Sequence, residues 1–370
     1  MKKYSRIFFL PVKFIFFVSF IFISGCNITN QKDSAVHDQN QKISEITIAA
    51  NGGVMERAIR DLIGPEFTKK TGIQIHFIAG LSSEIVARME ASKGNPTIDV
   101  AFIEPIDVLR VKEKGLTETL AEADIPNIKQ LDKAYTVSEI DDVWVPIFGF
   151  VVAPAYQTKS FEEHNWKPIH SWRDLADPQF KGRTAYVDVP NSWALLTLYF
   201  LALSEGGSFE DLEPGLKKAK EMARISETFY KNSTQVMPVI QQGEADISVL
   251  GSYVVVPLYN QGVPIKLAAP EEGVPLQATG TVISKGTARL KESQQFIDYF
   301  LSASSQSKLT DLGFFPVVKN VMIPEQYVDV IGMPEGTKMF MPSPEKLMKL
   351  RGIWSDRWMQ EVRTELGKDL

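Results

Sequence analysis

The chain has almost no cysteine: Cys26 is the only one in 370 residues. An internal disulfide needs two cysteines, so cross-links cannot stabilise the fold. Stability must come from buried apolar surface instead. Such burial is plausible, because 44% of the residues are hydrophobic and the chain is long enough for two domains.

A strong excess of either charge is also lacking. The sequence has 40 Lys and Arg residues against 45 Asp and Glu residues, a formal net charge of −5 at pH 7. Proteins that bind nucleic acid present clustered basic residues, and no such cluster occurs. We therefore expect no nucleic-acid partner.

Catalytic and metal-binding motifs are absent from the sequence. Its histidines have no metal-ligand spacing, and neither a nucleophile elbow nor a glycine-lysine phosphate loop occurs. We expect no enzymatic activity, no cofactor and no metal. An extracytoplasmic enzyme stays as an alternative, because a fold does not fix a function. The histidines are His37, His76, His164 and His170.

The N-terminus has the pattern of a secretory signal. Basic residues precede the apolar run "FIFFVSFIFIS", which ends at Ser24, and Gly25 and Cys26 follow it. These three residues resemble the lipobox of bacterial lipoproteins. The resemblance implies a signal peptide over 1–25 and a membrane anchor in which Cys26 carries diacylglycerol. The alternative is an uncleaved anchor, and both place the rest of the protein outside the cytoplasmic membrane.

Residues 26–43 are predicted to be the lipidated cysteine and a flexible tether, because they are polar and show no hydrophobic period. Strands and helices then alternate. The runs "EITIAA", "IQIHFIAG" and "IDVAFIEP" predict strands, and helical patterns separate them, one of which Ser82 or Ser83 can cap. This α/β order predicts a mainly parallel sheet covered by helices on both faces.

Two extended segments, "WVPIFGFVVAP" and "LQATGTVIS", lie about a domain's length apart. They are predicted to cross between two α/β lobes, as in the type 2 periplasmic-binding-protein fold. Lobe 1 would then comprise 44–147 with about 279–322, and lobe 2 would comprise 148–278 with about 323–370. The hinge is expected near 148–152 and 277–282.

Candidate ligand contacts follow the strands, where loops of both lobes would line the cleft. Most are small hydroxyl or amide side chains at helix N-termini, which favour anions. The alternative for several of them is a helix N-cap alone. The candidates are Asn51, Gly52, Gly53, Ser82, Ser83, Glu104, Asp188, Asn191, Ser192, Trp193, Ser233, Thr234, Ser252, Tyr253, Gln277 and Thr279.

From "ITIAANGG" to the C-terminus the chain resembles the solute-binding proteins of ABC importers, in the cluster that binds spermidine, putrescine, ferric iron and thiamine. The stretches "GPEFTKKTGIQIHF", "SWRDLADPQFKGRTAYVD", "VIQQGEADISVLGSY" and "IWSDRWMQEV" carry the likeness. The resemblance implies a monomeric receptor that closes two lobes around one small molecule. Its partners would be a membrane permease and the permease's ATPase.

The same resemblance bears on the solute. Polyamine binders have an acidic residue and an aromatic one on the returning crossover strand, where this chain has Gln277, Ala278 and Thr279. Ferric binders use neighbouring tyrosines, whereas Tyr253 stands alone. A small organic anion or zwitterion is therefore expected, with polyamine, ferric iron or thiamine as alternatives. A sensory or interaction lipoprotein of the same fold is a further alternative.

Overall fold

The computed structural model describes residues 44–368. The predicted signal peptide, the lipidation of Cys26 and the tether lie outside the described residues. Within 44–368, no helix combines the length and the apolar character needed to cross a bilayer.

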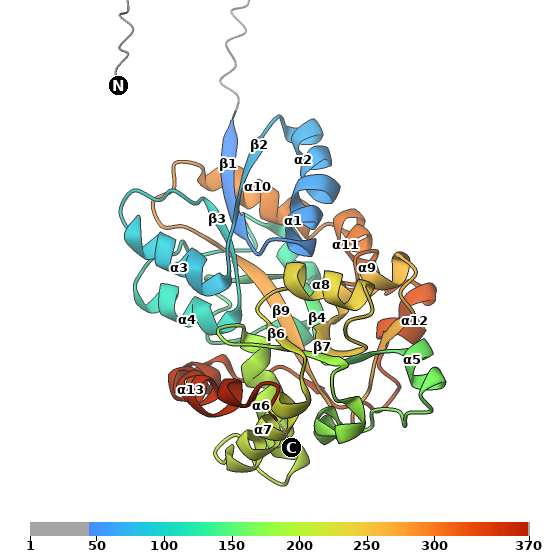
Figure 1. Ribbon diagram of the computed structural model, residues 1–370. Helices are drawn as coiled ribbons and strands as arrows, with labels where there is room; N and C mark the ends of the chain where they lie inside the picture. The colour runs from blue at the N-terminus through green and yellow to red at the C-terminus, as the bar shows by residue number, and fades with distance from the viewer. Residues whose placement is uncertain (1–43, 369–370) are drawn as a thin grey trace, which may run out of the picture. The chain divides into compact units, whose positions relative to one another are not determined.

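The first lobe is built on three parallel strands, β1 (Glu45–Ala50), β2 (Gln74–Ala79) and β3 (Val100–Ile103), with β1 in the middle. Figure 1 shows its helices packed beside these strands. The helices form where apolar residues recur at helical spacing, as Ile85, Val86 and Met89 do on α3. The helices are α1 (Val54–Arg57), η1 (Ala58–Ile63), α2 (Gly64–Thr71), α3 (Ser82–Ala91) and α4 (Pro105–Glu113), followed by η2 (Pro126–Gln130) and η3 (Lys133–Tyr135).

Two long strands, β4 (Val145–Gln157) and β9 (Val274–Ile283), connect the lobes. They pair antiparallel with each other, from Val145 opposite Thr281 to Val151 opposite Leu276. β9 also pairs with β3, and the far end of β4 pairs with β7 of the second lobe. The predicted crossing segments are therefore two adjacent strands of one sheet, whose order is β2-β1-β3-β9-β4-β7-β5-β6.

The second lobe has its own parallel strands, with β5 between β6 and β7. Its α6 is apolar on every side, as expected of a helix covered all round. The strands are β5 (Thr184–Val187), β6 (Thr228–Tyr230), β7 (Ile247–Gly251) and β8 (Ile265–Leu267). The helices are α5 (Thr158–Glu163), η4 (Trp172–Ala176), η5 (Pro178–Phe180), α6 (Ser192–Ser204), α7 (Glu213–Ile225), α8 (Ser233–Gln241) and α9 (Ser252–Asn260).

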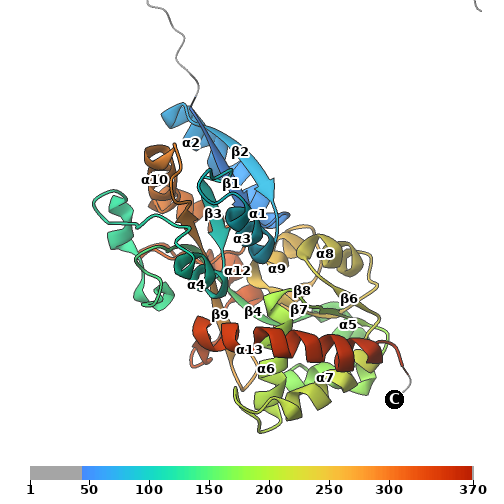
Figure 2. The same ribbon diagram turned by 90° about the vertical axis from the view of Figure 1, so that its left-hand side faces the viewer.

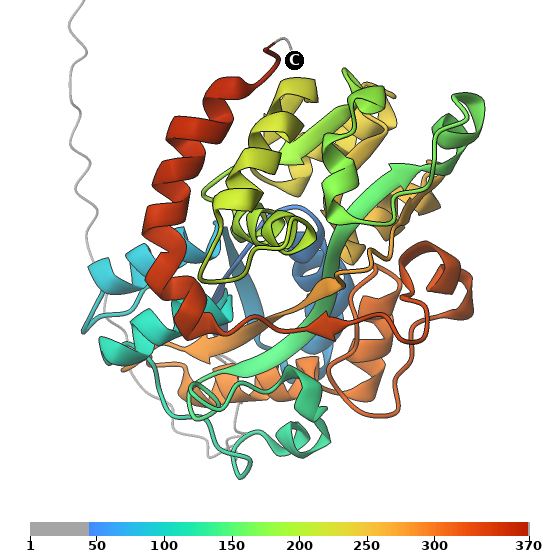
Figure 3. The same cartoon turned by 90° about the horizontal axis from the view of Figure 1, so that it is seen from below.

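The C-terminal part of the chain returns to both lobes. α10 (Leu290–Phe300) and α11 (Ala303–Thr310) pack in the first lobe, and α12 (Glu325–Ile331) contacts α9 and β8 in the second. After β10 (Met339–Phe340), α13 (Pro344–Arg357) contacts both α4 and α6. Figures 2 and 3 show α13 as a long helix along the outside of the second lobe. It continues into η6 (Trp358–Val362) and η7 (Arg363–Glu365).

Two sequence predictions need correction. The sheet is mixed, because the connecting strands run antiparallel to their neighbours in both lobes. Neither Ser82 nor Ser83 caps α3: the N-cap is Leu81, whose backbone N–H is bonded at 2.9 Å to the carboxylate of Glu84. The hydroxyl of Ser82 instead accepts a bond from the Glu104 amide at 3.1 Å.

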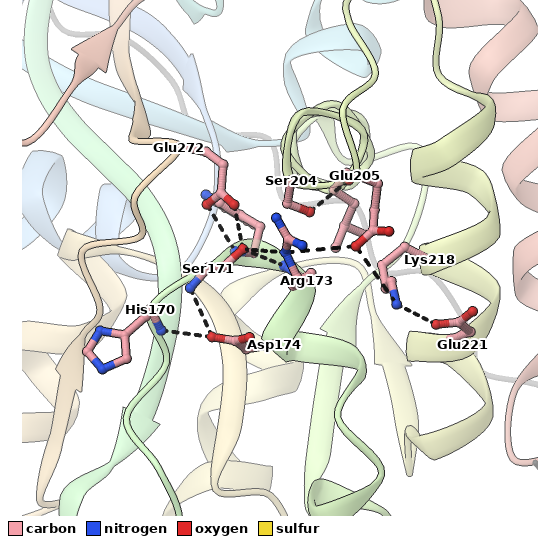
Figure 4. Close-up of polar contacts among 11 residues, drawn as sticks. His170, Ser171, Arg173, Asp174, Ser204, Glu205, Lys218, Glu221 and Glu272 are labelled. Carbon is pink, nitrogen blue, oxygen red and sulfur yellow. Dashed lines mark hydrogen bonds and ion pairs between the residues drawn. The ribbon is translucent and has the colours of Figure 1, made fainter.

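A polar network fixes the segment that leads into β9 (Figure 4). The carboxylate of Glu272 accepts bonds from the Ser171 hydroxyl and the Trp172 amide. Arg173 lies 3.9 Å from Glu205, which lies 4.0 Å from Lys218. The carboxylate that precedes the returning strand is thus bonded within the second lobe.

Candidate functional site

The largest cavity between the lobes has a volume of about 360 Å³, a size that suits a small ligand. We call it the main cavity. The loops after β1 and β2 line it from the first lobe, and the start of α8 lines it from the second. Its lining residues are Asn51, Gly52, Ala79, Gly80, Leu81, Glu84, Asn191, Trp193, Lys231, Asn232, Ser233, Thr234, Gln235 and Tyr253.

A smaller polar space adjoins the main cavity, with Asn51, Leu81, Asn191, Trp193 and Tyr253 in both linings. We call it the chamber, and its volume is about 30 Å³. The chamber residues that do not line the main cavity are Ser82, Ser83, Glu104, Asp107, Pro190, Ser192 and Arg351.

A third, mostly apolar space lies on the other side of Glu104 and Ser192. Gln277 of β9 lines it, together with Met341, Leu347 and other residues around the start of α13. Thus twelve of the predicted contacts line these three adjoining spaces: Asn51, Gly52, Ser82, Ser83, Glu104, Asn191, Ser192, Trp193, Ser233, Thr234, Tyr253 and Gln277.

The lobes approach each other closely at Gly53. This glycine has a φ of 72°, and a Cβ added to it would lie 3.0 Å from the Ser233 hydroxyl and 3.2 Å from the Thr234 methyl group. Only glycine adopts this backbone conformation without strain. The absent side chain therefore lets the β1 loop meet α8 across the cleft.

Three helices, α3, α6 and α8, begin at the cavity walls, so their first-turn amides lie beside it. The N-caps of α6 and α8 are Asn191 and Asn232, which accept bonds from Trp193 N and Gln235 N. Ser192 and Ser233 follow those caps, so capping does not use their hydroxyls. Asn191 is the predicted contact whose side chain does serve as a cap.

The wall between the main cavity and the core is aromatic. Trp193 and Tyr253 meet edge to face with centroids 5.8 Å apart, and Phe150 of β4 packs behind both. Burial raises the pKa of Tyr253 far above its ordinary value, so the phenol is neutral at neutral pH. Tyr259, six positions later, lies outside the cavity with 42% of its surface exposed.

Charges are separated along the cleft. Lys231 lines only the main cavity, and its ammonium group has no hydrogen-bond or ion-pair partner within residues 44–368. In the chamber, Asp107 of α4 binds Arg351 of α13 at 2.8 Å. This ion pair joins elements of the two lobes.

Glu104 lies between the chamber and the apolar space. Burial raises the pKa of its carboxyl above the ordinary value of 4.5, and the nearby carboxylate of Asp107 raises it further. Ser192 and Arg351 offset part of this rise, although the Ser192 hydroxyl lies outside normal hydrogen-bond geometry. The carboxyl therefore lacks a full counter-charge within the described chain.

Three predicted contacts lie outside these spaces and have other partners. Asp188 is bonded to Trp358 at 3.0 Å, and Ser252 donates to the Gly313 carbonyl at 2.7 Å. Thr279 is buried on β9 opposite Phe148. Their contact with a ligand stays a prediction.

Sequence reasoning missed Lys231, Asp107 and Arg351. Lys231 stands one residue before the cap of α8, so its proximity to the predicted Ser233 was a usable signal. No local signal marks Arg351, because it comes from a helix almost 250 residues after Asp107. Among residues 44–368, no group of three or more His, Cys, Asp or Glu side chains could hold a metal ion.

Comparison with known proteins places this geometry in a family. The family model described as bacterial extracellular solute-binding protein matches residues 64–334. A Haemophilus influenzae protein without a functional name is 25% identical over 309 residues, which cover 80% of this chain and 85% of that protein. A Salmonella typhi protein named as a candidate 2-aminoethylphosphonate-binding periplasmic protein is 22% identical, with 81% and 86% covered.

Solved structures agree in fold. An ABC transporter substrate-binding protein from Bradyrhizobium japonicum superposes with a TM-score of 0.70 at 23% identity, covering 86% of this chain and 99% of that one. The periplasmic binding protein AfuA from Actinobacillus pleuropneumoniae, with fructose-6-phosphate bound, gives 0.68 at 18% identity and the same coverage. These likenesses confirm the predicted two-lobed periplasmic-binding-protein fold. Since the family model covers most of the chain, the protein belongs to the bacterial extracellular solute-binding proteins.

Proposed function

We propose that this receptor of an ABC importer captures a small organic anion or zwitterion in the main cavity, with phosphonate, phosphate or carboxylate as its acidic group. The observation that carries the proposal is the unpartnered Lys231 beside the N-terminus of α8. A helix N-terminus and a lysine both favour an anion. The Ser233 hydroxyl lines the same wall and is available as a further donor, whereas the Thr234 hydroxyl donates to Asn232 Oδ1 at 2.6 Å.

The name of the Salmonella typhi relative supports this class of solute. The solute in that name, 2-aminoethylphosphonate, combines a phosphonate with an amine and is small enough for a cavity of about 360 Å³. The absence of acidic and aromatic side chains at 277–279 supports the same choice over a polyamine. Neutral Tyr253, without a neighbouring tyrosine or a metal-ligand cluster in the described part of the chain, disfavours ferric iron.

We further propose that solute capture closes the lobes about β4 and β9, with boundaries at 44–147 plus about 279–322 and at 148–278 plus about 323–370. The close approach at Gly53 is the expected closed contact. The closed receptor would act as a monomer, hold a lipid on Cys26 and deliver solute to a permease with its ATPase. The site is proposed to bind without catalysis.

The first experiment is to purify residues 27–370 and identify any co-purified small molecule by native mass spectrometry. Stripped protein is then titrated by calorimetry with 2-aminoethylphosphonate, a sugar phosphate, 4-aminobutyrate and spermidine. Binding of a phosphonate, phosphate or carboxylate with loss of affinity in Lys231→Gln supports the proposal. Binding of spermidine alone contradicts the assigned class of solute.

A further inference from the structure

The chamber contains polar oxygens that the protein leaves without partners. Asn51 Oδ1 and Asp107 Oδ2 are buried and accept no hydrogen bond from any group in residues 44–368. Asp107 as a whole is only 4% exposed, so water does not readily reach it. A buried acceptor without a donor is costly, which indicates that a donor belongs there.

The charges of the chamber are also unbalanced. Two carboxyl groups, Glu104 and Asp107, face one guanidinium, that of Arg351, which is bonded to Asp107 Oδ1. Ionised Glu104 would therefore leave one negative charge without compensation. A group with one positive charge and several N–H donors would compensate that charge and satisfy the acceptors.

The shape of the chamber limits what that group can be. A volume of about 30 Å³ accommodates a group of about the size of a water molecule. The chamber lies directly beside the main cavity, since residues such as Asn51 and Asn191 line both. A group at the end of a ligand in the main cavity could thus enter it.

We propose that the chamber binds the primary ammonium group of the solute, with Glu104 as its counter-charge and Asn51 and Asp107 as further acceptors. An ammonium has one charge and three donors, which match these three side chains. The inference rests on the proposed function, because the acidic end of the solute would lie at Lys231. It narrows the solute to a zwitterion with its amine at the chamber end.

The test compares matched ligands that differ only in the amine. Calorimetric affinities are measured for 2-aminoethylphosphonate against ethylphosphonate, for 4-aminobutyrate against butyrate, and for putrescine. Each is measured on the wild-type protein, on Glu104→Gln and on Glu163→Gln, whose exposed carboxylate lies on α5 away from the cleft. Circular dichroism and thermal unfolding show whether each variant is folded.

At least one of the two pairs is expected to bind. In the wild-type protein and in Glu163→Gln, the affinity for its amine-bearing member should exceed that for its deaminated member by about tenfold or more, as for a hydrogen-bonded charged group. In Glu104→Gln this preference should largely disappear, while the deaminated ligand binds as before. Equal wild-type affinity for both members of a pair would overturn the inference and leave the proposed function standing. Persistence of the preference in Glu104→Gln would also overturn it.

The remaining outcomes separate the two proposals. If putrescine alone binds and Glu104→Gln weakens it, the ammonium chamber is supported and the anionic solute is contradicted. If neither pair nor putrescine binds, the inference is contradicted, and the proposed function is decided by the sugar-phosphate titration and by the co-purified molecule. An inorganic cation as the occupant would appear as tighter binding of Na⁺, K⁺ or Ca²⁺ than of any amine, and would overturn the inference.

Discussion

The pair of connecting strands and the cleft beside it differ in how their buried polar groups are paired. All thirteen residues of β4 are buried, and the amide of Gln306 beside it is bonded within the protein, whereas the Thr281 hydroxyl on β9 has no hydrogen-bond partner among residues 44–368. Gln306 alone makes three such bonds, to Ile147 O, Phe300 O and Val317 N. In the cleft, by contrast, Asn51 and Asp107 keep buried oxygens without partners.

The unpaired oxygens of the cleft border the chamber, where a bound molecule can supply hydrogen-bond donors. Paired groups in the core specify one packing and resist change. Unpaired groups in the cleft lower the stability of the free protein, and binding of a complementary molecule raises that stability. The comparison can be tested from both sides.

The largest effect is expected for Gln306→Leu, which should leave three buried backbone groups without partners. At about 1 kcal/mol or more each, the loss in unfolding free energy is about 3 kcal/mol or more. Thermal unfolding should then shift down by roughly 4–5 °C. Gln360→Leu, at an exposed position, is the control. A shift equal to the control's would show that these bonds add little.

The largest change in ligand affinity is expected when a side chain is added at Gly53, where the lobes meet. Gly53→Val places carbon atoms against Ser233 and Thr234, so closure should be hindered. We expect an affinity loss of about 10- to 100-fold in calorimetry, the range that overpacking commonly causes. Gly182→Val is a matched control, because Gly182 has a similar φ of 75° and an added Cβ would meet nothing within 4 Å. Unchanged affinity in Gly53→Val would refute closure at this point.

The sequence predicted the connecting strands and many of the residues that line the cavities. Hydrophobic runs located the strands, and β4 and β9 coincide with the two segments expected to cross. Residues placed after strands, such as Asn51 and Ser233, line the cavity because strand ends of both lobes meet there. Asp107 and Arg351 were not predicted, because their meeting depends on how α13 packs against α4. Local patterns contain no information on such a distant contact.

A smaller effect on binding is expected for Lys231→Gln. Removal of the ammonium should weaken an anionic solute by about 5- to 10-fold, as for one charge-assisted hydrogen bond near the surface. The affinity of the variant should also depend less on salt. Lys319→Gln, an exposed lysine remote from the cavity linings, serves as the control. Equal losses in both variants would mean that Lys231 acts only through net charge.

The smallest effect is expected in the pH dependence of the ligand-free protein. A carboxyl whose pKa is raised on folding stabilises the fold below its unfolded value of 4.5, and this contribution is lost as the pH rises through the folded pKa. Wild-type protein should therefore lose stability relative to Glu104→Gln between pH 4.5 and neutrality. Thermal unfolding of both proteins across this range measures the difference. A constant difference would argue against a perturbed Glu104.

The position of Arg351 in the chain also affects the order of assembly. Ribosomes make proteins from the N-terminus, and α13 is among the last segments to appear. Until it docks between α4 and α6, Asp107 lacks its ionic partner and the chamber lacks one wall. A chain truncated before residue 344 should thus form much of both sheets without a finished binding site. Recognition of the solute therefore depends on a segment that follows both sheets in the chain.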